Sequence, residues 1–593
     1  MEQLLLQFLE KYLGQEMCSM IQFAPIPKGK GGDLAMSFFN IAKVAPKPLP
    51  NAEEFEPLKT ESVEFWNKYL KGLYFGVTVD KIAERCEYLF RECELLEKTE
   101  LTGPYLNLFF KNEIFFSQVF ETPLKSDVMK DKTIVLEFSG PNTNKPLHLG
   151  HMRNHALGIS LSNLLEQVGA KMHRVNIIND RGVHICKSML SYQKWGNGET
   201  PESTGIKPDL FVGNYYVKFD QELKKNESLM EEVQEMLKKW EAGDEETMAL
   251  WKQMGDWALT GHAKTYERQG IKFEKDYFES EYYKKGKDIA EQGLKDKVFK
   301  KRDDGAIVID LSEEGLDEKV ILRADGTSIY LTQDLAVAQA RKKDFNPNQL
   351  MYVVADEQNY HFKVLFSCLD KLGLLKKDEC HHLGYGLVNL PDGRMKSREG
   401  TVVDADNLMD ELSGLALEAI EKRNPELTKD EATKMSEQIQ NAAWKFYLLS
   451  TSPKKGITFD SQKSIQFEGA TGPYLQYAGV RIKSILKKAD SKSEPGLGSN
   501  PGSILGTPEK PLGVKLIEFP NVLEKAAETL NPTYVVTYLL ELAQEWSSFY
   551  AENSVLKADT EELKQARLQL AQKVLEVLET GLKILGIEIP EKM

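Results

Sequence analysis

The sequence predicts an α/β protein in which a parallel, doubly wound sheet is preceded by a small α+β region and followed by an all-helical region. Three observations predict this fold class. Residues 133–178 follow a strand, helix and strand order, which is the βαβ unit of parallel sheets. Further strand patterns resume after a polar helical stretch. After about residue 404 helical patterns replace strands, and 593 residues suffice for several domains.

The composition is that of a large globular protein. Hydrophobic residues make up 41% of the chain, which excludes the disordered, collagen-like and disulfide-scaffold classes. With 76 Lys and Arg against 90 Asp and Glu, the formal net charge is −14. This balance argues against a surface coated in basic charge for sequence-independent nucleic-acid binding, although it leaves room for a local basic patch.

Cysteine usage and hydropathy indicate the compartment. The six cysteines are scattered with no C-x-x-C pair, so neither a zinc knuckle nor a disulfide framework is indicated, and a reducing compartment fits best. The first ten residues lack the basic region of a signal peptide, and no later stretch reaches the roughly 18 continuous apolar residues of a membrane helix. We therefore expect a cytoplasmic protein with no membrane partner.

The first two domains are expected at residues 1–130 and 131–465. In the α+β domain, apolar residues at helical spacing indicate an opening helix (Leu5, Phe8, Leu9, Tyr12 and Leu13), and residues 105–110 alternate as in a strand. In the parallel-sheet domain, the expected order is a strand at 133–139, a break at 140–142, a helix at 152–168 and a strand at 171–178.

A helical insertion is expected at about residues 197–290, because residues 218–269 are rich in Glu and Lys at helical period, with Trp240, Trp251 and Trp257 as anchors. Later strand patterns are expected to complete the sheet, at residues 306–309, 328–331, 351–354 and 386–388. Helices at 412–422 and 429–449 lead to an all-helical domain at 466–593. In that domain only residues 490–513, rich in Pro, Gly and Ser, are expected as a loop.

The loop after the first sheet strand is the most informative segment. It contains His148, Gly150 and His151, just before the predicted helix. A loop between a parallel strand and a helix offers free backbone N–H groups and the positive end of the helix dipole, which suit phosphate. Two histidines three residues apart share a helix face and can donate hydrogen bonds to a phosphoryl transition state, while Gly150 leaves room for a nucleotide ring. A chance match or a zinc site is the alternative, but no third ligand is nearby in a zinc pattern.

The segment from Glu137 to Asn142, with Lys145 and the His148-x-Gly150-His151 motif, resembles the class I aminoacyl-tRNA synthetases, and among them the arginyl-tRNA synthetases. The run from Thr471 to Ala478 and the C-terminal residues 585–593 are also similar to that family, so the likeness covers nearly the whole chain. It implies a Rossmann-like catalytic domain, an N-terminal tRNA-binding domain and an all-α anticodon-binding domain.

Recognition of arginine needs carboxylates, because a guanidinium is a planar fork of donors. Glu137 is the polar exception in an apolar strand, and Asp334 follows Tyr330 by four residues. By resemblance, Glu137, Tyr330 and Asp334 hold the guanidinium, while Gly140, Asn142 and Gln358 hold the amino-acid backbone. From composition alone, Glu137 could instead be exposed on an edge strand, and Tyr-x-x-x-Asp at a strand end is common.

A second motif covers residues 392–400, a turn followed by a basic loop that could neutralise leaving pyrophosphate. It resembles the family's mobile Lys-Met-Ser-Lys-Ser loop, but Arg394 stands for the first Lys and Ser397 for the second. Lys145 is the family's usual substitute for that second Lys, and Lys396 could also contribute. The resemblance therefore implies four catalytic residues (His148, His151, Lys145 and Lys396) and an ATP-binding set (Gly150, Gly386, Leu387, Val388, Met395, Ser397 and Arg398). Without the first motif this segment would be a solvated basic turn.

The C-terminal region has slightly more acidic than basic residues, so any phosphate-binding surface must be local, for example along Arg481, Lys483, Lys487 and Lys488. Single-stranded loops are recognised by stacking on aromatics and by base-edge hydrogen bonds. By resemblance and spacing, the tRNA-binding candidates are Tyr474, Tyr477, Arg481, Trp546, Tyr550 and Met593. Aromatics at helical spacing usually belong to a core. We assign the His184 and Cys186 pair and the Cys380-His381-His382 run to structure, because neither has the spacing of metal ligands, and we take His361 as a secondary candidate near the active site.

The resemblance implies a ligase that activates L-arginine with ATP and Mg²⁺ and transfers it to tRNA(Arg), with activation requiring bound tRNA. We also expect a monomer. Three rivals remain: an H-x-G-H adenylyltransferase that does not use tRNA, another class I synthetase, and a synthetase-like binding module without catalysis. The helical C-terminal domain disfavours the first, and the pair of Glu137 and Asp334 disfavours the second. The altered basic loop is the feature that permits the third.

Overall fold

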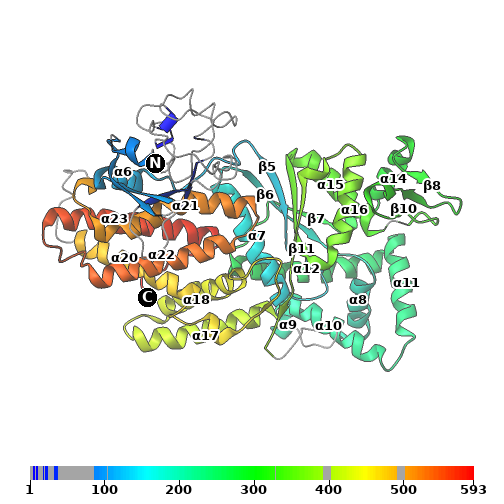
Figure 1. Cartoon of the computed structure of the whole chain (residues 1–593). Helices are drawn as coiled ribbons and strands as arrows, with labels where there is room; N and C mark the ends of the chain where they lie inside the picture. The colour runs from blue at the N-terminus through cyan, green and yellow to red at the C-terminus, as the bar shows by residue number, and fades with distance from the viewer. Residues whose placement is uncertain are drawn as a thin grey trace, which may run out of the picture. The chain divides into compact units, whose positions relative to one another are not determined.

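A computed structural model describes residues 86–91, 93–102, 105–327, 329–391, 403–490 and 501–593, with Leu5, Leu6, Leu9, Glu10, Cys18, 21–24 and 33–37 before them. The chain forms two compact units. The first comprises residues 1–123, 484–519 and 544–575, and the second comprises residues 124–483, 520–543 and 576–593. Each is described separately below, and Figure 1 labels their elements.

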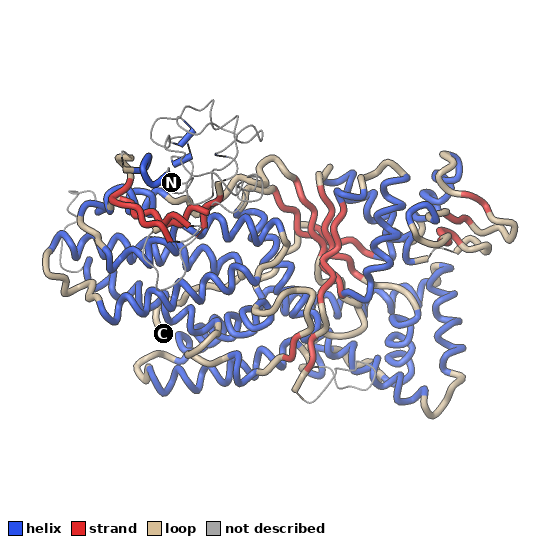
Figure 2. The backbone as a smooth tube through the Cα atoms, in the orientation of Figure 1, coloured by secondary structure: helices blue, strands red, loops and turns tan. Residues whose placement is uncertain are grey.

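The second unit is built on a five-stranded sheet in the order β12-β11-β5-β6-β7 (Figure 2), and every neighbouring pair is parallel. The strands are β5 (Thr133–Glu137), β6 (Lys171–Ile178), β7 (Lys275–Phe278), β11 (Gln349–Ala355) and β12 (Cys380–Tyr385). From β5 the chain continues to β6 on one side, and β11 lies on the other. In doubly wound sheets, ligands bind where the strand order reverses, at the carboxyl ends of such neighbours.

The first βαβ unit is confirmed. The helix α7 (Leu149–Gln167) connects β5 to β6, and its buried residues lie on nearly every side, as expected of a helix enclosed by a domain. Its N-terminus follows directly on the loop that carries the histidine motif.

The later strands differ from the prediction. Residues 351–354 do lie in β11, but β9 (Ile307–Ile309) belongs to a separate antiparallel sheet with β8 (Lys300–Lys301) and β10 (Lys319–Leu322). The strand β13 (Val388–Asn389) pairs only with β14 (Ile457–Thr458). The sheet is instead completed by β12 and β7, which were not predicted, and β7 falls inside the range expected as the insertion.

The predicted strand at 328–331 is wrong, because Tyr330 begins helix α15 (Tyr330–Phe345). The short Ile-Tyr-Leu run is strand-prone, but the longer run to Phe345 is rich in Ala and Leu and buries Leu331, Leu335 and Ala338 at helical spacing. The longer helical period therefore decides the local structure.

The range expected as a helical insertion contains α9 (Pro201–Thr204), α10 (Pro208–Leu223), α11 (Leu229–Ala242) and α12 (Glu245–Gln269), which follow α8 (Val183–Trp195). The side chain of Asp244 caps α12 by accepting from the Thr247 N–H, and Gly270 ends that helix in the left-handed conformation. Trp240 is buried, whereas Trp251 and Trp257 are half-buried against the same cluster.

Other helices of this unit cover the sheet or follow it. They are α13 (Glu279–Tyr282), α14 (Lys285–Lys295), α16 (Asn359–Lys371), α17 (Ala405–Arg423), α18 (Lys429–Leu449) and α19 (Ser461–Ser464). The last two predicted helices before the C-terminal domain are thus confirmed as α17 and α18. Across the described residues, no helix is long and apolar enough to cross a membrane.

The first unit contains an antiparallel sheet in the order β1-β2-β4-β3, with helix α6 (Asn112–Glu121). Its strands are β1 (Gln22–Ala24), β2 (Leu34–Ser37), β3 (Leu96–Thr102) and β4 (Tyr105–Phe110), the last as predicted. Leu5 and Leu9 are helical and buried, whereas Phe8, Tyr12 and Leu13 lie outside the described residues. Asp33 beside β2 pairs with Lys510 at 2.8 Å.

The C-terminal helices are α20 (Gly472–Asp490), α21 (Lys510–Glu528), α22 (Thr533–Glu552) and α23 (Glu561–Ile584), and each has residues in both units. The helix α21 begins at Lys510, inside the stretch predicted as a loop. Within the first unit, Lys573 of α23 donates to the carbonyl of Thr122 at 2.7 Å, which ties that helix to the end of α6.

Candidate active site

The loop after β5 leaves the sheet through a sharp, side-chain-supported turn. Ser139 and Gly140 both have positive φ, at 79° and 63°. Ser139 tolerates this conformation because its N–H donates to Asn154 Oδ1 at 2.6 Å, while the Gly140 N–H donates to Asn176 Oδ1 at 3.0 Å. These bonds set the direction in which Asn142 and the rest of the loop leave the central strand.

His148 and His151 lie side by side at the start of α7, with ring centroids 4.0 Å apart. The Gly150 N–H donates to His148 Nδ1, and the His148 N–H donates to His151 Nδ1, both at 3.1 Å. Because each Nδ1 accepts, each neutral ring carries its proton on Nε2. The pair therefore has the tautomer in which each Nε2 is a hydrogen-bond donor, as binding of a phosphate oxygen requires.

Both histidines are held neutral. Burial, with Lys145 and His155 adding to it, lowers the pKa of His148 to about 3. Burial and His148 lower the pKa of His151 well below its usual value. The motif itself requires glycine at position 150, because a Cβ there would lie 2.9 Å from Cε1 of His148. Glycine thus allows the His148 ring to fold back over its own helix start.

A cleft of about 740 Å³ opens beside this motif, and Asn142, Lys145, His148 and Asp404 are among its lining residues. Burial lowers the pKa of Lys145. Within the described ranges, its ammonium has no hydrogen-bond or ion-pair partner. A half-buried cation without a carboxylate partner is unfavourable, and cations of this kind occur at functional sites, where an anionic ligand supplies the missing partner.

The backbone after the second motif is paired with the first. The Leu149 N–H donates to the Val403 carbonyl, and the Ala405 N–H donates to the Leu147 carbonyl, both at 3.0 Å. The second motif itself, with Arg394, Met395, Lys396, Ser397 and Arg398, lies outside the described residues. The described chain resumes at Val403, whose carbonyl is bonded beside His148.

A second cleft, of about 1220 Å³, shares Asn142 and His184 with the first, and Asn142 and Tyr330 are the two residues of the expected arginine-binding set that line it. Tyr330, at the N-terminus of α15, lines it and is 76% exposed. Asp334, one turn further along, accepts from His361 Nε2 at 2.5 Å. Burial alone would lower the pKa of His361, but the hydrogen bond and charge of Asp334 raise it overall. The secondary candidate His361 therefore contacts a primary one.

Composition alone allowed Glu137 to be exposed on an edge strand. The structure instead buries it in the central strand of the sheet. Its carboxylate forms an ion pair with Arg341, which is fully buried two turns after Asp334 on α15. Burial raises the pKa of Glu137, and the Arg341 charge opposes that rise. This glutamate already has a guanidinium partner from its own chain, so geometry weakens its direct role toward a substrate.

Glu279, which sequence reasoning missed, takes a place beside Asp334. It directly follows β7, is buried, and lines the second cleft. Burial raises the pKa of Glu279 to about 7; Arg181 lowers it, while Asp180 and Asp334 raise it. The signal that could have found it is its position directly after a parallel strand, but β7 was assigned to the insertion.

The remaining catalytic-domain candidates lie at or after neighbouring strand ends. Gln358 is exposed in a single turn (Asp356–Gln358) that follows β11. Gly386 donates its N–H to the Pro453 carbonyl at 2.9 Å, and a Cβ there would lie 2.5 Å from the Gly456 nitrogen. Leu387 is 40% exposed, and Val388 pairs with Ile457. Close backbone approach thus requires glycine at position 386.

Some of the tRNA-binding candidates are accessible at the surface, whereas others are buried or already bonded within the protein. Tyr474, Tyr477 and Arg481 lie on the less buried face of α20, and the Arg481 guanidinium lies 5.7 Å from the Tyr477 ring centroid. Lys483 is occupied by ion pairs with Glu579 and Glu591, so its predicted phosphate role is not favoured. In the first unit, Trp546 is buried at 3% exposure and stacks on Tyr550.

Met593 packs with Phe467 against a buried cluster of α17 and α18. It therefore contributes at least part of its side chain to packing.

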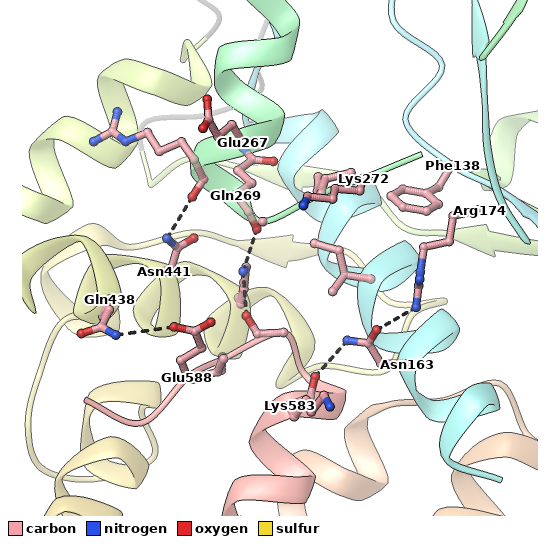
Figure 3. Close-up of a pocket in the computed structure, with 17 residues that line it drawn as sticks. Phe138, Asn163, Arg174, Glu267, Gln269, Lys272, Gln438, Asn441, Lys583 and Glu588 are labelled. Atoms are coloured by element: carbon pink, nitrogen blue, oxygen red, sulfur yellow. Dashed lines mark hydrogen bonds between the residues drawn. The ribbon is translucent and has the colours of Figure 1, made fainter. Parts of the chain in front are cut away.

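A third cavity, of about 500 Å³, lies where the C-terminal tail meets α7, α12 and α18 (Figure 3). Here Lys445 is fully buried and donates to the carbonyls of Gln269 at 2.8 Å and Gly586 at 2.7 Å. Asn163 donates to the Lys583 carbonyl at 2.9 Å and accepts from Arg174. The Lys445 ammonium and the Asn163 amide are thus both hydrogen-bonded within this cavity.

Gln269 connects this cavity to the loop after β5. Its side-chain oxygen accepts from His155 Nδ1 at 2.6 Å, and His155 Nε2 contacts Ser139 Oγ at 2.8 Å. Burial lowers the pKa of His155 to about 4, so the ring is neutral and Ser139 donates to it. Gln269 is thus bonded on one side, through Lys445, to Gly586 of the C-terminal tail, and on the other, through His155, to the turn at Ser139.

Comparison with known proteins agrees with this geometry. The family model described as the class I (R) tRNA synthetase catalytic domain matches residues 117–460, and that of the DALR anticodon binding domain matches residues 475–593. The arginine–tRNA ligase of Treponema denticola is 46% identical over 83% of this chain and 85% of its own length. That of Amoebophilus asiaticus is 43% identical over 92% of this chain and 95% of its own.

Among solved structures, Thermus thermophilus arginyl-tRNA synthetase superposes with a TM-score of 0.80 at 25% identity, covering 100% of this chain and 99% of that one. A parallel sheet with the histidine motif at its central strand end, followed by an anticodon-binding helical region, defines a class I aminoacyl-tRNA synthetase. Within that class, the chain belongs to the arginine–tRNA ligase family.

Proposed function

We propose that this chain joins L-arginine to tRNA(Arg) in two steps, using the two clefts that share Asn142. The observation that carries the proposal is the pair of neutral, Nε2-protonated histidines after β5, with the Lys145 ammonium in the adjoining cleft, beside acidic side chains on α13 and α15. The first suits the phosphates of ATP and the second suits a guanidinium. Family membership over most of the chain agrees with this division.

In the first step the arginine carboxylate would attack the α-phosphorus of ATP, and pyrophosphate would leave. His148 and His151 would donate from Nε2 to phosphate oxygens as charge shifts to the leaving group. Lys145 would neutralise that charge from the cleft wall, in the place of the absent second lysine of the basic loop. Positioning and charge stabilisation account for most of the rate enhancement in such a transfer.

The guanidinium would lie between Asp334 and Glu279, with Tyr330 at the cleft mouth. Arg341 would keep Glu137 from binding it directly, while the Glu137 charge still adds to the negative potential at Asp334. Asn142, at the junction of the clefts, would hold the amino-acid backbone next to ATP. In the second step a terminal ribose hydroxyl of tRNA would attack the arginyl carbonyl and release AMP.

Mg²⁺ would accompany ATP. Among the residues that the structure describes, no group of three or more His, Cys, Asp or Glu could hold an ion by itself, so the phosphates would be its main ligands. We further propose that the chain acts as a monomer in the cytoplasm. Its six cysteines are buried, as suits a reducing compartment. Tyr474, Tyr477 and Arg481 would meet the anticodon loop.

The experiment is ATP–pyrophosphate exchange with each of the twenty amino acids, with and without total tRNA. We expect exchange with arginine alone, and only when tRNA is present. A His148→Ala variant purified in parallel controls for a contaminating host enzyme and should give none. Absence of arginine-dependent exchange in both conditions, with tRNA still bound, would make the protein a binding module.

A further inference from the structure

The backbone of Lys145 is held from the helical insertion. His262 of α12 is 1% exposed, and its Nε2 lies 2.9 Å from the Lys145 carbonyl oxygen. A carbonyl only accepts, so Nε2 of His262 carries the proton and donates. Its other ring nitrogen, Nδ1, is buried with no hydrogen-bond partner in the described part of the chain. This ring therefore makes its one hydrogen bond to the residue proposed to bind phosphate.

The surroundings of His262 hold it neutral. Burial lowers the pKa of His262, while Asp209 opposes this and Lys207 adds to it. Lys207 itself donates to Asp209 at 2.9 Å and to Asp406 at 2.6 Å, so the charges nearest His262 are already paired. The ring thus acts as a fixed neutral donor.

The neighbouring Pro146 is held by a second insertion helix. At Gly213 of α10, a Cβ would lie 2.7 Å from Pro146 Cδ and 3.5 Å from Lys145 Cα. The proline ring is rigid, and its Cδ cannot move without its backbone. Gly213 therefore lets α10 pack directly against the Lys145-Pro146 peptide.

We propose that His262 and Gly213 are positioning residues for Lys145, through which the helical insertion sets the distance of its ammonium from the phosphates. The inference rests on the role of Lys145 in the proposed function. A long, flexible side chain delivers its charge accurately only if its own backbone is fixed. Displacement of about 1 Å at a reacting group can cost about 100-fold in rate.

The test measures arginine-dependent ATP–pyrophosphate exchange, with tRNA present, for His262→Phe, His262→Gln and Gly213→Ala. Phenylalanine fills the space but cannot donate, whereas the glutamine amide can donate from nearly the same place as Nε2. We expect His262→Phe and Gly213→Ala to lower kcat at least tenfold with little change in the KM for arginine. His262→Gln should recover most of that loss.

Two matched controls separate this effect from general damage. Gly255→Ala lies on the same helix, where a Cβ would meet nothing within 4 Å. His173→Phe replaces another buried histidine, which lies on β6. Its Nδ1 is 2.7 Å from a carboxylate oxygen of Glu274. Both should keep kcat within about twofold, and thermal midpoints identify any variant that fails to fold.

The decisive measurement is a double-mutant cycle with Lys145→Ala. If His262 acts through Lys145, then His262→Phe should lose nothing further once Lys145 is alanine. Equal losses in both backgrounds would overturn the inference, as would full activity of His262→Phe and Gly213→Ala beside an inactive Lys145→Ala. Failure of the proposed function would look different, because the wild-type chain would then show no arginine-dependent exchange.

Discussion

Two lysines of this chain, Lys445 fully buried and Lys145 half-buried, lie in contrasting cavities. Lys445 donates to the Gln269 and Gly586 carbonyls. In the same cavity, Asn163 is bonded to Arg174 and to the Lys583 carbonyl (Figure 3). Lys145 lines the cleft beside the histidine motif, and its ammonium has no such partner in the described ranges. The comparison teaches that satisfaction of polar groups, rather than cavity size, distinguishes a structural joint from a reactive site.

The largest expected effect is the loss of activity when Lys145 is replaced. Lys145→Ala should lower arginine-dependent exchange by about 100-fold or more, because loss of one charge-stabilising donor typically costs that much. The free energy of unfolding of the variant, measured in urea, should match or exceed that of the wild type, since a half-buried cation that burial disfavours has been removed. If the variant instead unfolds more easily and remains active, then Lys145 belongs with Lys445 as a structural residue.

A smaller effect is expected for the guanidinium site. Asp334→Asn should raise the KM for arginine by about 10- to 100-fold, because a charge-assisted hydrogen bond is worth about 1.5–3 kcal/mol. The KM for ATP should change much less, and steady-state exchange at varied arginine and ATP separates the two constants. Equal changes in both would place Asp334 in a shared structural role with His361, to which it is bonded.

On the structural side, Lys445→Met should reduce the free energy of unfolding by about 1–3 kcal/mol, because two buried carbonyls lose their donor. Urea denaturation measures the change. The matched control is Lys583→Met, whose side chain is exposed at the same cavity while only its carbonyl accepts from Asn163. A similar loss of unfolding free energy in both variants would show that the two hydrogen bonds of Lys445 make no specific contribution to stability.

The smallest effect is a pH dependence at the same joint. Burial lowers the pKa of Lys445 to about 8, below its value in the unfolded chain. Above that pH the folded chain loses the proton first, so the unfolded state binds more protons and stability rises with pH. The neutral amine retains two N–H donors for the two carbonyls.

Between pH 8 and 9, the stability of the wild type relative to Lys445→Met should therefore rise by up to about 1.4 kcal/mol, the value of one pKa unit. Urea denaturation at both pH values measures this difference. A difference that falls with pH would show that Lys445 gains an anionic partner in solution.

Sequence patterns over short stretches correctly predicted those parts of the fold that form between residues close together in the chain. The β5-α7-β6 unit and the histidine motif lie within some 45 residues, where hydrophobic period and turn residues suffice. The start of α15 was mistaken for a strand because three β-prone residues open a longer helical run. Which β-prone runs share a sheet depends on pairing between distant segments, so β9 and β13 were assigned to the wrong sheet.

The candidate site shows the same limit. His148 and His151 are recognisable because spacing alone places them on one helix face. The pairing of Glu137 with Arg341 joins residues 204 positions apart, and no sequence period connects them. Glu279 and His262 come from a region rich in charged residues, so neither stands out from its neighbours. Their proximity to the clefts arises from packing of the insertion.

The contact between Gly213 and Pro146 also constrains how this family can diverge. The atom that an added Cβ would meet at 2.7 Å is the proline Cδ, which no other amino acid places at that point of the backbone. The two positions should therefore be inherited as a pair. In relatives where a larger residue replaces the glycine, natural selection should also have removed the proline, and such lineages would show how else the insertion can hold the cationic loop.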